Sequence, residues 1–138
     1  MSLNSLRKDL FSYIQANWTD SIIVFQDQDT NDEIAQGPDP FVYFYLSFSK
    51  ATDQKTLGKN NVVFVRYGTA AAKIFVRKEA GTGLLFELAD KFEAIVRNQK
   101  INNTQLKAPN TTIFKNPPPG WIGVSVACPF SSDTQHSI

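Results

Sequence analysis

The sequence predicts an α+β fold in which two amphipathic helices pack on a mainly antiparallel sheet. Apolar residues recur at spacings of three and four in two segments, near residues 3–17 and 84–98, as expected of helices. The remaining apolar segments are short and rich in β-branched and aromatic residues, which is typical of strands. Two helices cannot supply a crossover for every pair of strands, so most neighbouring strands should be antiparallel.

Length and composition indicate a single domain spanning residues 1–138. The chain has 138 residues, of which 42% are hydrophobic, and this is enough for a core without disulfides or a structural metal. A formal net charge of +1 is too small for the broad positive field that non-specific nucleic-acid binding needs. No apolar run approaches the ~20 residues of a membrane span, so we expect a protein made in the cytoplasm with no membrane partner.

The first part of the chain should contain one helix and two strands. Residues 3–17 place leucine, isoleucine and tryptophan on one helical face, and residues 21–26 form a short strand directly afterwards. Residues 41–49, "FVYFYLSFS", are apolar on both faces of the next strand. Either helices cover both of these faces or one face meets another subunit. Residues 50–61 are polar and lysine-rich, which predicts a long flexible connection.

Two further strand-like segments precede the second helix. Residues 62–68 and 72–78 predict a β-hairpin or a bulged continuation of one strand. The helix near 84–98 then begins after Gly81-Thr82-Gly83, a tight turn with Thr82 as the helix cap. A glycine-rich turn before a helix can also bind phosphate. The third glycine of the dinucleotide fingerprint and the Gly-Lys-Ser/Thr of the phosphate loop are missing, which favours the plain turn. A small nucleotide-binding or phosphate-binding domain that uses Gly81–Gly83 is the alternative from another functional class.

The chain closes with two strands and a polar end. Residues 111–115 and 120–130 are strand-like, and the stiff segment Pro117–Gly120 joins them. The polar residues from about 131 onward predict a flexible C-terminal tail.

No set of residues predicts catalysis, a metal site or a cofactor. The acidic stretch 27–33, "DQDTNDE", starts like a calcium loop but has Asp32 where the sharp bend needs glycine and Pro38 where the last ligand should be. The only cysteine, Cys128, lies in an apolar strand, which predicts a buried reduced thiol. The only histidine, His136, lies in the polar tail. We therefore expect no enzyme.

Aromatic residues are the most informative part of the composition. Eleven Phe, four Tyr and two Trp exceed what one small core readily hides. A well-filled core is one interpretation, and a surface that another chain covers is the other. For the second interpretation, the candidate interface residues are the aromatic side chains Phe41, Tyr43, Tyr45 and Trp121 and the loop lysines Lys50, Lys55 and Lys59.

Four segments together resemble the tail-terminator, or tail-completion, proteins of long-tailed bacteriophages, including a phage-related domain of unknown function. They are the leading helix ending in "NW", "PDPFVYFYLSF", "VRYGTAAAKIFVRKEAGTGLLFELADKFEAIVRN" and "PPPGWIGVSVACPF". The matching positions are Gly68, Ile74, Val76, Gly81, Gly83, Ala89, Asp90, Phe92, Trp121, Val124, Val126, Pro129 and Phe130. Gly123 departs from the pattern, because such proteins often carry a polar side chain there.

The resemblance implies an α+β subunit, without cofactor or catalytic residue, that assembles into a hexameric ring at the end of the tail tube of a phage or prophage. Such a ring stops tube polymerisation and offers a surface to head-completion proteins, so the implied location is the neck of the virion. The implied partners are the chain itself, the tail-tube protein and a head-completion protein, with passing DNA as a further candidate contacted without sequence specificity. Another neck, head–tail joining or minor tail protein is the alternative within this class.

Overall fold

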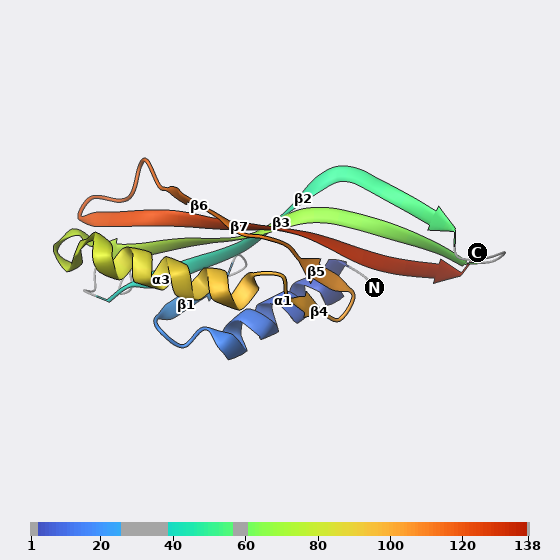
Figure 1. Ribbon diagram of the computed structural model, residues 1–138, viewed down its shortest axis with the longest axis horizontal. Helices are drawn as coiled ribbons and strands as arrows, with labels where there is room; N and C mark the ends of the chain where they lie inside the picture. The colour runs from blue at the N-terminus through green and yellow to red at the C-terminus, as the bar shows by residue number, and fades with distance from the viewer. Residues whose placement is uncertain (1–2, 26–38, 57–60, 138) are drawn as a thin grey trace.

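The computed structural model describes residues 3–25, 39–56 and 61–137. Two α-helices, α1 (Leu3–Asn17) and α3 (Gly81–Val96), lie on the same side of a curled, mostly antiparallel sheet (Figure 1). This arrangement confirms the predicted α+β class. A single 3₁₀ turn, η1 (Lys78–Ala80), precedes α3. No helix in the described ranges is long and apolar enough to cross a membrane.

Seven strands make up the sheet, in the order β1-β2-β3-β7-β5-β4, with β6 also paired to β7. Only β1 and β2 run parallel among the pairs that the structure describes. The strands are β1 (Ile22–Phe25), β2 (Phe41–Thr56), β3 (Asn61–Arg77), β4 (Lys100–Ile101), β5 (Thr104–Leu106), β6 (Asn110–Ile113) and β7 (Trp121–Ser137). The short pair β4–β5 had no clear pattern in the sequence.

The three central strands are much longer than the sequence predicted. Residues 62–68 and 72–78 form neither a hairpin nor a bulge, because β3 runs without interruption and pairs with β7 in one register from Asn61↔Ser137 to Arg77↔Trp121. Residues 50–56, expected in a flexible connection, extend β2 beyond an irregularity between Phe48 and Thr52. Residues 131–137, expected as a flexible tail, continue β7.

These extensions build a three-stranded arm that projects beyond both helices (Figure 1). The arm consists of residues 52–56 of β2, 61–67 of β3 and 131–137 of β7. The polar composition of its two outer strands, residues 52–56 and 131–137, conceals them in the sequence, since no helix covers them and no alternation of apolar residues is required there. The backbone ladder with β3 satisfies the amide and carbonyl groups of the outer strands regardless of side-chain polarity.

Side chains on the even-numbered positions of β2, β3 and β7 face the helices and form the main core. Phe44 and Phe92 are fully buried there, with ring centroids 6.2 Å apart, and Trp18 packs edge-on against Phe92. The two helices are joined directly, because the Tyr13 hydroxyl of α1 donates a 2.7 Å hydrogen bond to the Ile95 carbonyl of α3. The amphipathic patterns in the sequence therefore identify the helical faces correctly.

The glycine-rich segment before the second helix differs in detail from the prediction. The helix already begins at Gly81, so Thr82 lies within its first turn, and the N-cap position is Ala80 without a side-chain hydrogen bond. Gly81 has φ = +86°, a conformation that favours glycine. The change of chain direction between η1 and α3 explains why glycine stands at position 81.

Candidate functional site

The face of the sheet opposite the helices, hereafter the far face, carries most of the predicted interface aromatics. Odd-numbered positions of β2, β3 and β7 point to this side, because alternate residues of a strand project to opposite faces. Phe41, Tyr43 and Tyr45 of β2 lie there, and the register places Phe41 opposite Phe75 and Tyr43 opposite Lys73. Neither helix contributes to the cluster that forms on this face.

Two of the predicted interface residues are covered by the chain itself. Phe41 and Trp121 are only 6% and 2% exposed. Together with Phe75 they form a second small core. The ring centroid of Phe41 lies 5.1 Å from that of Phe75 and 5.1 Å from that of Trp121. Phe114, which follows β6, packs edge-on against Phe75 at 5.6 Å. The expectation that Phe41 and Trp121 present an exposed surface is therefore wrong, because residues distant in sequence cover them.

Gly123 makes this second core possible. A Cβ at this position would lie 2.8 Å from a ring carbon of Phe75, closer than side-chain carbons approach. A larger side chain at this position would displace the Phe75 ring. The glycine on β7 is thus matched to the aromatic residue opposite it on β3.

The remaining aromatic side chains of the far face stay partly exposed and surround a lysine. Tyr43 and Tyr45 are half-buried, with ring centroids 5.9 Å apart. The Lys73 ammonium lies 5.5 Å from the Tyr45 ring centroid and 5.1 Å from that of Phe114. No carboxylate lies within salt-bridge distance of Lys73 in the part of the chain that the structure describes. Lys73 was not among the residues predicted from the sequence.

A shallow depression of about 400 Å³ opens between these residues. Its walls are aromatic or apolar, and its polar groups are an ammonium, a phenol and an amide. The lining residues are Phe41, Tyr43, Lys73, Phe75, Phe114, Asn116 and Pro118. An apolar hollow with one cation suits an apolar or aromatic group that carries a negative charge.

Further cation–π pairs extend along the same face. The Arg77 guanidinium lies 4.0 Å from the Trp121 ring centroid, and the Lys107 ammonium lies 5.6 Å from that of Tyr67. Cations held over aromatic rings in this way keep their charge while the rings shield part of it from water. The far face is consequently both aromatic and cationic.

A second hydrophobic surface lies on the other side of the sheet, where α3 meets β6. Phe86 on α3 and Ile113 on β6 are 46% and 71% exposed, which is high for such large apolar side chains. Between them is a groove of about 130 Å³ whose lining is almost entirely apolar. Its residues are Thr82, Leu85, Phe86, Ile113, Phe114, Pro117, Ile122 and Gly123. Phe114 therefore contributes to the hollows on both sides of the sheet.

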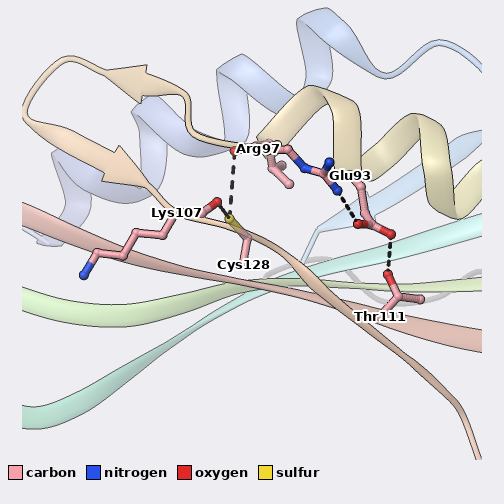
Figure 2. Close-up of polar contacts among 6 residues, drawn as sticks. Glu93, Arg97, Lys107, Thr111 and Cys128 are labelled. Atoms are coloured by element: carbon pink, nitrogen blue, oxygen red, sulfur yellow. Dashed lines mark hydrogen bonds and ion pairs between the residues drawn. The ribbon is translucent and has the colours of Figure 1, made fainter.

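Polar contacts fix β6, and with it Phe114, against the helix layer (Figure 2). The Glu93 carboxylate of α3 accepts a 2.8 Å hydrogen bond from the Thr111 hydroxyl of β6 and forms a 2.8 Å ion pair with Arg97. Nearby, the buried Cys128 thiol donates to the Lys107 carbonyl at 3.1 Å. Burial raises the pKa of the Cys128 thiol, so it stays protonated and unreactive. This confirms that Cys128 is buried, as predicted.

The other predicted site residues lie apart from the far-face hollow or outside the described residues. The backbones of Lys50 and Lys55 belong to β2 and not to a loop, whereas Lys59 and the acidic stretch 27–33 fall outside the described residues. Across the described ranges, no three His, Cys, Asp or Glu side chains gather as a metal site would require. The space around Gly81 and Gly83 is open, because apart from the adjacent backbone no atom lies within 4 Å of an added Cβ.

Comparison with known proteins identifies the fold and nothing more specific. No family model matches the chain, and no curated protein matches it. Among solved structures, 19 chains match. One of them, a protein without a descriptive name, superposes with a TM-score of 0.62 over 96% of each chain at 10% sequence identity. A likeness at this level of identity extends to the architecture alone.

Proposed function

We propose that this chain is a virion structural protein that caps the tail tube of a long-tailed bacteriophage. In this role it assembles as a ring-shaped homo-oligomer, a hexamer by the family resemblance, ends tube polymerisation and presents a surface for the head-completion protein. It acts by binding and has no catalytic step. Assembly takes place in the cytoplasm of the bacterial host, and the finished ring lies in the neck of the virion.

The observation that supports the proposal best is the far face of the sheet. Tyr43, Tyr45 and Lys73 form a half-exposed aromatic and cationic surface that neither helix covers. Half-exposed aromatic side chains around a shallow hollow are typical of protein–protein contacts. Ring formation by head-to-tail contacts would cover such a surface on every subunit.

The protruding arm supplies a second surface suited to assembly. Residues 45–56 of β2, beyond β1, form one outer edge of the described sheet, and residues 134–137 of β7, beyond β5, form the other. Strand edges present unpaired amide and carbonyl groups, to which a strand from a neighbouring protein can add. We assign the arm to contacts with the tube or the adjacent subunit.

Deletion of the gene from its phage or prophage tests the proposed function against its closest alternative. Loss of a tail terminator should give tubes of uncontrolled, excessive length that carry no heads. Loss of a head–tail joining protein should give tails of normal length that also lack heads. Tail length measured by electron microscopy therefore separates the two, and restoration by the plasmid-borne gene is the control.

A further inference from the structure

The far-face hollow and the outer surface of α3 are complementary to each other. Phe86 and Asp90 are four residues apart on α3, so they lie side by side on one helical face. Both are exposed, and Leu85, Leu88 and Phe92 on the opposite face of the helix pack against the sheet. The aromatic walls of the far-face hollow could hold the exposed ring of Phe86, and the Lys73 ammonium could pair with the exposed carboxylate of Asp90.

Neither charge is neutralised by an ion pair within the described chain. Lys91 on α3 pairs with Asp20 at 3.2 Å and with Glu87 at 3.7 Å, which leaves the neighbouring Asp90 without a cation within salt-bridge distance among the described residues. Lys73 faces aromatic rings. Over the described ranges, one subunit thus carries an unpaired carboxylate on its helix side and an unpaired ammonium on its far face.

The two surfaces lie on opposite sides of the same subunit. The helix α3 covers one face of the sheet (Figure 1), and the residues that line the hollow lie on the other face. The two surfaces cannot meet within one chain. Two different surfaces that face apart are what a head-to-tail contact requires, and such contacts close into a ring when the rotation between copies permits.

We infer that a second copy of this chain occupies the far-face hollow, with its Phe86 ring against the aromatic walls and its Asp90 carboxylate on Lys73. The inference rests on the proposed function, since it specifies the contact between adjacent subunits of the ring. Aromatic anchors at the centre of an interface commonly contribute about 2 kcal/mol or more, which corresponds to roughly 30-fold in affinity. Phe86→Ala should weaken ring formation by at least about that factor.

A charge exchange tests the contact directly. Lys73→Asp and Asp90→Lys each place like charges at the interface and should each abolish rings, as seen by sedimentation velocity and electron microscopy with and without tail tubes. An equimolar mixture of the two variants should form rings again, because each interface then joins opposite charges in alternation, and an even-membered ring can close. The double variant Lys73→Asp/Asp90→Lys should also assemble on its own.

Controls separate this inference from folding and from the proposed function. Lys8→Asp makes the same change of charge at an exposed position on α1 and should leave ring formation unaffected. Denaturation curves should show that all variants remain folded. If the wild-type chain forms rings and both single variants do so equally well, the inferred contact is overturned while the ring survives. A wild-type chain that forms no ring even on tail tubes overturns both.

Discussion

Replacement of Phe41 by alanine should destabilise the isolated subunit strongly. Phe41 is 6% exposed, and its ring lies 5.1 Å from both Phe75 and Trp121. Removal of a buried phenylalanine ring costs about 3–5 kcal/mol, because both the transfer free energy and the packing of the neighbours are lost. Since the far face lies at the edge of the core, we expect a value near the lower end, ~3 kcal/mol. Domains of this kind have only about 5–15 kcal/mol of stability in total.

Phe86→Ala is the matched control, because the same side chain is removed from a half-exposed position. Because Phe86 is 46% exposed, its removal should cost roughly half of the ~1.5–3 kcal/mol that full burial of such a side chain contributes to stability. The higher helix propensity of alanine returns up to ~0.7 kcal/mol of that. The net change should stay within about 1 kcal/mol.

Urea denaturation at a protein concentration where the chain is monomeric measures both effects, with tryptophan fluorescence as the signal. Unchanged m-values would show that the shifts in midpoint reflect stability. If Phe41→Ala costs no more than Phe86→Ala, the far-face aromatics are not a core of the monomer, and the original expectation of an exposed Phe41 would be restored.

Two further predictions concern a pair of glycines and the cysteine. Gly68→Ala should destabilise the fold by about 1–3 kcal/mol, since its Cβ would lie 2.7 Å from the Phe130 ring. Gly83→Ala, in open space on α3, should stabilise the fold by about 0.5–1 kcal/mol. Equal melting temperatures of the two variants would contradict both expectations. Burial holds the pKa of the Cys128 thiol above its ordinary value of 9.0, so the unfolded chain loses this proton first as pH rises. Unfolding free energy should therefore fall above pH 9 by up to ~1.4 kcal/mol per pH unit until the folded pKa is reached. Cys128→Ala should show a shallower fall in urea titrations between about pH 8 and 10, and identical slopes would refute the assignment.

The helices and the strand segments could be predicted from the sequence because each has one face in the main core. Leu10 and Ile14 on α1 and Leu88 and Phe92 on α3 are buried at the predicted spacings. The two outer strands of the arm could not be predicted in the same way, although residues 62–68 of its central strand were. Its strands lie beyond the helices, so no apolar periodicity marks residues 50–56 or 131–137, and their pairing depends on partners far away in the chain.

The candidate site shows the same limit. Alternation along β2 correctly groups Phe41, Tyr43 and Tyr45 on one face, but it cannot tell which of them the fold covers. Coverage of Phe41 depends on Phe75 and Trp121, which come from β3 and β7. The register between β2 and β3 also places Lys73 next to the tyrosines, and the pattern of a single sequence does not specify this register.

The most direct test of the central claim is the length of tail tubes polymerised in vitro with and without this protein. Purified tail-tube protein from the same phage should stop growing when the chain is added, and electron micrographs should show a ring at one end of each tube. Phe86→Ala, which should remain folded, should cap poorly. Tubes that continue to elongate without rings at any concentration of the folded wild-type protein would contradict the assignment.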